Sequence, residues 1–195
     1  MFGIASETKK NLLAEINLSD SFESLWIDRL NTTDHRYLKD LRINVQNVLK
    51  SQNITKKEAL LLTLSVAINE KQSKEIIEGI ESLLKAAGTE EKEIQEVAAC
   101  VSLMNANNIF YRFRHFMDSE TYNTMPAGIK MSIMMNPVLG KEFFELLSLA
   151  ISAINGCEMC VTSHEASVRQ HGASQARVFD AVRLAAVMKS LFTLV

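Results

Sequence analysis

Start and stop signals for α-helices recur along most of this chain. Residues 55–58 read Thr-Lys-Lys-Glu, a capping box that opens an apolar run over residues 59–68. Gly88 is typical of a helix end, and the helix it closes is expected to begin near Ser73. Only two of the 195 residues are proline, so few positions interrupt a helix. We therefore predict an all-α protein.

Charge and hydropathy exclude several partners. The formal net charge of −2 gives no basic surface for nucleic acid. The longest uncharged helical runs, such as residues 146–157, are shorter than the ~20 residues that a membrane span needs. Charged residues follow Met1 to Ile4 directly, without the apolar stretch of a signal peptide. We expect a soluble, cytoplasmic protein with neither a nucleic-acid nor a membrane partner.

The chain contains a weak internal repeat. Residues 67–69 and 153–155 both read Ala-Ile-Asn at the end of a long apolar helix, and similar text recurs further along each block. We predict one domain over residues 1–195, built from related helical halves at approximately 1–125 and 126–195. This register sets Lys71 and Lys74 opposite Cys157 and Cys160, which leaves the chemistry to the second half.

The residues with the strongest chemical signal lie around a predicted helical hairpin. Its first helix, approximately residues 141–154, is apolar nearly all round and belongs in the interior. Its polar exceptions, Glu145, Ser148 and Ser152, share one face and need polar partners. After a break at residues 155–156 a second helix begins at Cys157, with one stripe that contains Cys157, Cys160, His164, Ser167 and His171. The two polar stripes are expected to face each other.

This arrangement predicts redox chemistry at the two cysteines. Thiols in the first turn of a helix meet unpaired N–H groups, which favour the thiolate. His164, one turn beyond Cys160, could take the thiol proton or stabilise the anion. Burial is expected to raise the pKa of Glu145, which would suit a proton donor near neutral pH. We predict a proton-transfer line of Glu145, His164 and Cys160.

Simpler interpretations compete with this one. A zinc site would use both cysteines and His164, but it lacks a fourth ligand unless Glu145 supplies it. Taken alone, Glu145 and His164 would more often be structural groups of a core. His171 precedes Gly172 and is better explained as a partner of the helix C-terminus, and Cys100 as an inert buried thiol. We predict no bound metal.

The spacing Glu145-x11-Cys157-x2-Cys160-x3-His164 resembles the signature of the AhpD family (alkyl hydroperoxide reductase D), within the carboxymuconolactone decarboxylase-like superfamily. Residues 107–112 and 152–157 are also similar to the family, and the clear likeness covers roughly residues 100 to 190. The resemblance implies an AhpD-like helical fold and an antioxidant thiol peroxidase. Met159 departs from the family, which often has a histidine immediately before the second cysteine.

The resemblance also implies roles and partners. Cys160 would attack the hydroperoxide and become a sulfenic acid, Cys157 would resolve it as a disulfide, and Glu145 and His164 would relay protons. No cofactor would be bound, and dihydrolipoamide, carried by a lipoyl-bearing dehydrogenase-complex subunit, would be the external reductant. An AhpC-type peroxiredoxin would be a second partner, and the protein would be a homotrimer. Two alternatives stay open: a protein-disulfide electron-transfer adaptor with weak peroxidase activity, and a carboxymuconolactone decarboxylase-like enzyme.

Overall fold

The computed structural model describes residues 2–195, with side chains from residue 7 onward. Within this range the chain forms helices and no β-strand, so the all-α prediction is confirmed. The helices are α1 (Phe2–Ala14), α2 (Leu25–Thr32), α3 (Arg36–Leu49), α4 (Lys56–Asn69), α5 (Lys74–Ala86), α6 (Glu91–Met117), α7 (Glu120–Thr124), the 3₁₀ turn η1 (Ser132–Met134), α8 (Lys141–Ile154), α9 (Glu158–Gln170) and α10 (Gln175–Phe192). No helix in the described range is both long and apolar enough to cross a bilayer.

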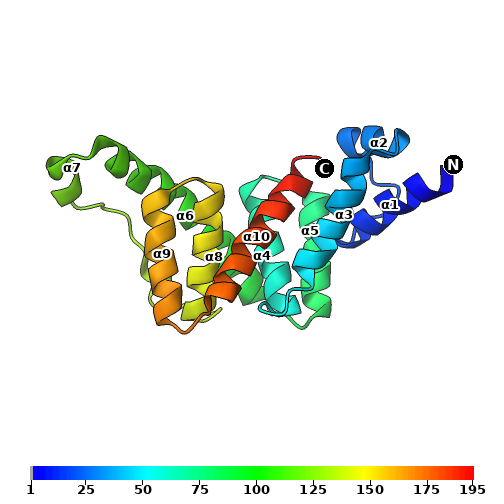
Figure 1. Cartoon of the computed structure of the whole chain (residues 1–195). Helices are drawn as coiled ribbons and strands as arrows, with labels where there is room; N and C mark the ends of the chain where they lie inside the picture. The colour runs from blue at the N-terminus through cyan, green and yellow to red at the C-terminus, as the bar shows by residue number, and fades with distance from the viewer. Residues whose placement is uncertain (1) are drawn as a thin grey trace.

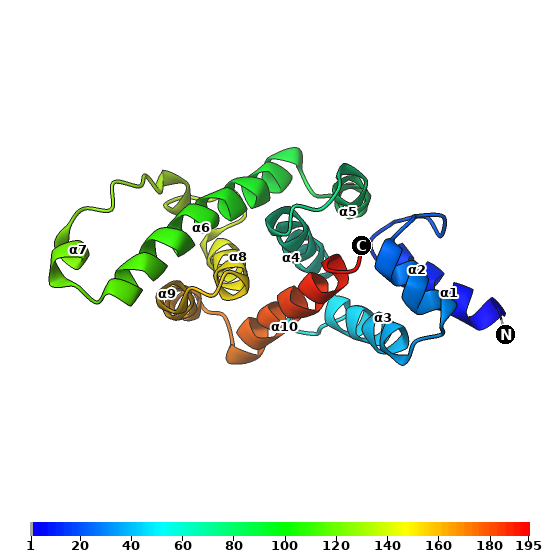
Figure 2. The same cartoon turned by 90° about the horizontal axis from the view of Figure 1, so that it is seen from above.

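The helices are arranged along one long axis of the molecule (Figure 1). Helices α4, α8 and α10 lie in the middle, α1 to α3 form one end, and α9 with the second half of α6 forms the other. Seen from above, α6 continues past the other helices and carries α7 at its tip (Figure 2). The segment after α7 then returns towards α8. The end of α6 and α7 therefore make a projecting arm at the α9 end of the molecule.

Two apolar helices, α4 and α8, form the centre of the core. Residues 59–67 of α4 and 143–152 of α8 are buried without a break. The predicted capping box is present, since Thr55 Oγ1 accepts from the Glu58 N–H and the Glu58 carboxylate accepts from the Thr55 N–H. The interior helix predicted over residues 141–154 has those bounds in the structure. Burial of such continuous apolar surface is the main driving force of folding.

The lengths of four helices match in the way that the internal repeat predicts. Helices α4 and α8 both have 14 residues, and α5 and α9 both have 13. The N-caps of the second pair are Ser73 and Cys157, whose side chains each accept from the backbone N–H three residues on. Ser73 therefore holds the same N-cap position before α5 as Cys157 holds before α9, whereas the Ala-Ile-Asn register sets Lys71 opposite Cys157. Two more residues separate Asn69 from Ser73 than separate Asn155 from Cys157, which accounts for the difference. The boundary of the halves near residue 125 stays a prediction.

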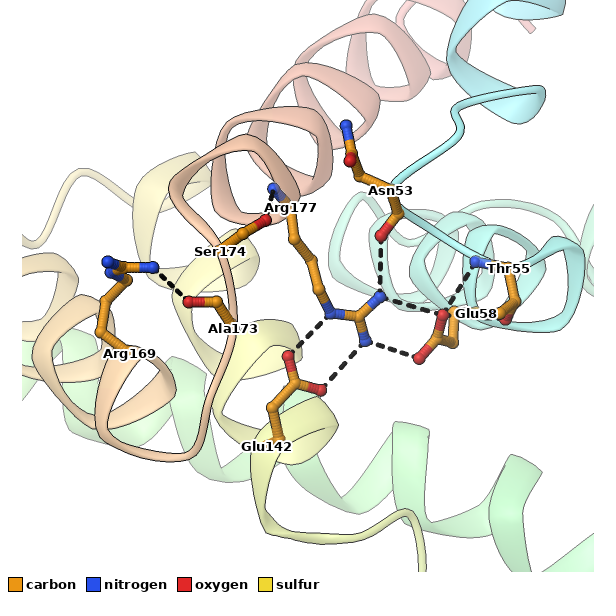
Figure 3. A network of polar contacts seen from close by, with 8 residues as sticks. All are labelled: Asn53, Thr55, Glu58, Glu142, Arg169, Ala173, Ser174 and Arg177. Atoms are coloured by element: carbon orange, nitrogen blue, oxygen red, sulfur yellow. Dashed lines mark hydrogen bonds and ion pairs between the residues drawn. The ribbon is translucent and has the colours of Figure 1, made fainter.

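An arginine at the start of α10 joins the first turns of α4 and α8 (Figure 3). The Arg177 guanidinium donates to both oxygens of Glu142 at 2.7 and 3.0 Å and to both oxygens of Glu58 at 2.6 and 3.1 Å. It also donates to the Asn53 carbonyl at 3.0 Å. Burial alone would raise the pKa of Glu58, but the Arg177 and Thr55 hydrogen bonds outweigh it and hold that pKa below its ordinary value. One cation thus allows two carboxylates to share a partly buried site.

Replacing Arg177 with methionine should destabilise the protein by about 3 kcal/mol, because two partly buried carboxylates would face each other without a cation. Urea denaturation of the oxidised protein at pH 7 measures this loss. Arg183→Met is the matched control on the same helix, since the Arg183 side chain is half exposed and its pair with Asp180 should contribute at most about 1 kcal/mol. Equal losses in the two variants would show that the Arg177 cluster is no more stabilising than a surface ion pair.

Candidate active site

A helical hairpin formed by α8 and α9 carries the predicted site. The turn between the helices uses Asn155 as C-cap and Gly156 at a φ of +69°, a conformation that favours glycine. Cys157 follows in an extended conformation as the N-cap of α9, and its Sγ accepts from the Cys160 N–H at 3.3 Å. The second helix therefore begins at Glu158, one residue later than predicted, because Cys157 is the cap itself.

The two cysteines of the hairpin are joined as a disulfide. Their Cα atoms lie 5.2 Å apart, within the range that a disulfide needs. Cys157 is fully buried, whereas Cys160 keeps 6% of its surface exposed. The predicted pair is thus bridged, and the cysteine further along the chain is the more accessible of the two.

Glu145 and His164 meet across the hairpin, as the predicted facing of the two stripes requires. His164 Nδ1 lies 2.7 Å from Glu145 Oε2. The other oxygen, Oε1, is 2.9 Å from Lys141 Nζ, one turn earlier on α8. A neutral imidazole that donates Nδ1–H to a carboxylate leaves Nε2 as an acceptor. In that tautomer, Nε2 is the nitrogen of His164 that can accept a proton.

The predicted protonation behaviour of Glu145 is wrong. Burial of this side chain does raise the pKa, as the sequence suggested. Hydrogen bonds from His164 and Lys141 together outweigh burial, however, and the pKa of Glu145 lies below its ordinary value. Glu145 is consequently ionised at neutral pH. It can anchor and orient His164, but it does not hold a proton to give away.

The two serines of the predicted α8 stripe contact α6 rather than α9. Ser148 Oγ lies 3.4 Å from Cys100 Sγ and donates to the Phe144 carbonyl at 2.8 Å. Ser152 Oγ accepts from Asn108 Nδ2 at 2.8 Å. The expected polar partners therefore exist, but the prediction that both stripes face each other holds only for Glu145 and His164.

A chain of asparagines fixes the turn that precedes Cys157. Asn155 Nδ2 donates to Asn108 Oδ1 at 2.9 Å, and Asn155 Oδ1 accepts from Asn69 Nδ2 at 3.1 Å. Arg112 of α6 donates to the Asn155 carbonyl at 2.6 Å. The Cys157 N–H donates to the Ser152 carbonyl at 3.1 Å. These bonds tie the redox turn to α4 and α6, so the position of Cys157 depends on three helices.

A cavity of about 270 Å³ opens beside Cys160. Its polar lining residues are Asn107, Cys160, Ser163 and His164, and Tyr111, Met131 and Met134 also line it. Met159, which stands before the second cysteine, also borders it and is 37% exposed. The cavity gives a small molecule access to Cys160 and His164 together.

The loop that supplies one wall of this cavity is held at two points. The buried Glu96 carboxylate accepts from the Val138 and Leu139 N–H groups, each at 2.7 Å. Lys141 Nζ donates to the Met134 carbonyl at 2.7 Å in addition to its pair with Glu145. Lys141 therefore links the cavity wall to the carboxylate that orients His164.

Other candidate residues fall outside this site. Burial raises the pKa of the Cys100 thiol to about 12, so this cysteine stays protonated. His171 is the C-cap of α9, as its position before Gly172 suggested. Among the described residues, no group of three or more histidine, cysteine, aspartate or glutamate side chains could hold a metal ion.

Two parts of the site escaped the sequence analysis. Lys141 is not among the predicted site residues, although its i, i+4 spacing to Glu145 indicates an ion pair. The asparagine chain joins residues from α4, α6 and α8, and no local pattern indicates which of the many asparagines meet.

Comparisons with known proteins identify the class of protein to which this chain belongs. The carboxymuconolactone decarboxylase family signature matches residues 121–191, which contain the hairpin. Alkyl hydroperoxide reductase AhpD of Rhizorhabdus wittichii is 38% identical over 158 residues, which cover 80% of this chain and 90% of that protein. AhpD of Hyphomonas neptunium is 35% identical over 84% of this chain and 90% of the relative. AhpD of Rhodopseudomonas palustris is 37% identical over 80% and 84%.

The helical hairpin with a cysteine pair at its turn therefore belongs to a protein of the carboxymuconolactone decarboxylase type. The chain itself is a member of the AhpD family of alkyl hydroperoxide reductases. The family resemblance found in the sequence is thereby confirmed. The roles of Cys160, Cys157, His164 and Glu145 stay predictions, which the geometry above makes testable.

Proposed function

We propose that this protein is an antioxidant thiol peroxidase that reduces alkyl hydroperoxides through Cys160. One observation carries the proposal: Cys160 and His164 line the same small cavity, while Cys157 is bonded to Cys160 and buried behind it. A nucleophile needs both access to its substrate and a base within reach. The cavity that Cys160 shares with His164 supports its role as the nucleophile, and the disulfide supports Cys157 as the resolving thiol.

The proposed cycle begins with the reduced pair. The Cys160 thiolate attacks the terminal oxygen of ROOH, the O–O bond breaks, and the alkoxide takes a proton to leave as ROH with a Cys160 sulfenic acid. The Cys157 thiol then attacks the Cys160 sulfur, which forms the disulfide and releases water. A dithiol donates two electrons and two protons to restore both thiols. His164 takes the Cys160 proton, and the ionised Glu145 stabilises the resulting imidazolium.

We further propose that the dithiol is dihydrolipoamide, carried by a lipoyl-bearing subunit of a dehydrogenase complex and not bound as a cofactor. An AhpC-type peroxiredoxin would receive electrons from the same cysteine pair, in the cytoplasm, where thiols are kept reduced. The names of the relatives support the hydroperoxide reaction. Met159 lines the cavity and is 37% exposed, which supports access by a protein-bound dithiol.

Peroxide consumption by the whole protein tests this proposal. We expect turnover of an alkyl hydroperoxide with dihydrolipoamide, and faster turnover when an AhpC-type peroxiredoxin is added. Monothiol glutathione is the control reductant and should support little turnover, because it lacks the second thiol that completes the exchange within one molecule. Absence of turnover with dihydrolipoamide, both with and without the peroxiredoxin, would refute the proposal.

A second candidate function is an electron-transfer adaptor with weak peroxidase activity of its own. Met159 favours it, because a thioether neither gives nor takes a proton at neutral pH. In the same assay an adaptor would show turnover only with the peroxiredoxin present. The decarboxylase alternative has no task for the Cys157–Cys160 disulfide, so the geometry supports it least.

The projecting arm supports self-association, which we propose is the homotrimer that the family resemblance implies. Apolar side chains stay exposed along the end of α6 and beyond it, namely Ile109, Phe113, Phe116, Met117, Tyr122 and Met125. An exposed apolar surface of this kind marks a contact with another chain. Sedimentation equilibrium should return three times the 21.9 kDa of one chain, and a monomer or dimer mass would disprove the proposal.

A further inference from the structure

Asn107 of α6 is buried at the edge of the cavity beside Cys160. Only 5% of its surface is exposed, and it lines the cavity together with Cys160 and His164. Its Nδ2 donates to the Met131 sulfur at 3.2 Å. Its Oδ1 is buried and has no hydrogen-bond partner within the described part of the chain. A buried acceptor without a partner is costly and uncommon in native proteins.

The neighbouring asparagine shows what a structural amide looks like here. Asn108 is 1% exposed, and both ends of its amide are engaged. Its Oδ1 accepts from Asn155 Nδ2 at 2.9 Å, and its Nδ2 donates to Ser152 Oγ at 2.8 Å. Adjacent residues of one helix thus hold one satisfied and one unsatisfied amide. The unsatisfied amide is the one that lies at the cavity.

A hydroperoxide provides the group that Asn107 lacks. Its terminal O–H is a donor, and the same terminal oxygen must lie against the Cys160 sulfur for attack. Tyr111, Met131 and Met134 also line the cavity and suit an alkyl or aryl group. The volume of about 270 Å³ equals roughly nine water molecules at ~30 Å³ each, which suits a small organic molecule.

We propose that Asn107 is a substrate-binding residue whose Oδ1 accepts a hydrogen bond from the terminal O–H of an organic hydroperoxide. This inference rests on the peroxidase function proposed above and adds the residue that places the substrate. The bond holds the terminal oxygen next to Cys160, while the organic group lies against the methionine side chains. Asn107 takes no part in the later steps, because disulfide formation and reduction do not involve the peroxidic O–H.

The half-reactions of the whole protein separate this role from a structural one. Asn107→Leu keeps a similar volume without polar atoms, and Asn107→Ala removes the amide with less bulk. In stopped-flow experiments, the reduced variants should react with cumene hydroperoxide about tenfold more slowly than wild type, the effect of one lost hydrogen bond. Reduction of the Cys157–Cys160 disulfide by dithiothreitol should stay within about twofold of wild type. Ser102→Ala, at an exposed position of the same helix, should change neither rate.

Two outcomes would overturn the role of Asn107. In one, the peroxide step of both variants is as fast as wild type. In the other, both half-reactions slow to the same extent, which would show a structural defect.

If the wild type itself fails to consume hydroperoxides, the peroxidase proposal falls, and product binding tests Asn107 separately. Cumyl alcohol, titrated into the oxidised protein and followed by the methyl resonances of Met131 and Met134, should bind severalfold more weakly to both variants. Equal binding to wild type and variants, or no binding to either, would also overturn the inference.

Discussion

Replacing Cys160 with serine should abolish hydroperoxide turnover, whereas replacing Cys157 should leave one oxidation per protein molecule. Cys160 borders the cavity and shares it with His164, so it is the cysteine that a substrate can reach. Cys157 is fully buried behind the disulfide. Without Cys157 the Cys160 sulfenic acid should form and persist, because no second thiol resolves it. Trapping with a dimedone-type reagent followed by mass spectrometry would place the label on Cys160 in the Cys157→Ser variant.

Cys100→Ser is the matched control for these substitutions. The Cys100 thiol is buried and its pKa is raised to about 12, so this variant should turn over at the wild-type rate. Label on Cys157 in the Cys160→Ser variant, formed as fast as wild-type oxidation, would reverse the assigned roles. Loss of turnover in Cys100→Ser would show that the third cysteine takes part in the chemistry.

The fold around the site was largely readable from local sequence patterns. The capping box at Thr55 and the apolar run of α8 are signals that lie within one helix, and both elements have the predicted character. Register across a repeat is different, because extra residues in a turn change every later pairing. The N-cap positions of Ser73 and Cys157 match, although the Ala-Ile-Asn match before them aligns Cys157 with Lys71.

The sequence predicted the part of the candidate site that lies within the α8–α9 hairpin. Spacing on α8 and α9 was enough to bring Glu145 to His164, since the two helices share a tight turn. The unsatisfied Asn107 and the asparagine chain involve other helices, whose relative placement no helical period gives. The prediction of a raised pKa for Glu145 was wrong, because that pKa depends on the balance between burial and two hydrogen-bond partners.

Glu145→Gln should lower hydroperoxide turnover by about 10²-fold or more, the usual range for a disturbed acid–base group. The glutamine would keep the shape but not the charge that stabilises protonated His164. It would also allow the imidazole to adopt the other tautomer, with the wrong nitrogen towards the cavity. Initial rates with saturating dihydrolipoamide measure the effect. Glu165→Gln is the control, because Glu165 is a half-exposed carboxylate beside His164 in sequence and should retain nearly full activity.

The pH dependence tests whether Glu145 anchors His164 or shuttles protons. The folded-state pKa of Glu145 lies below the ordinary 4.5, so its charge, and the stability and activity it supports, is present above that pH. Both are lost as the pH falls through the lowered folded-state value. Between pH 5 and 8 Glu145 should therefore add no titration of its own to the wild-type protein. A Glu145 carboxyl NMR resonance that titrates within this range would show instead that Glu145 carries protons. Equal rates for the two proteins throughout this range would make Glu145 a structural carboxylate.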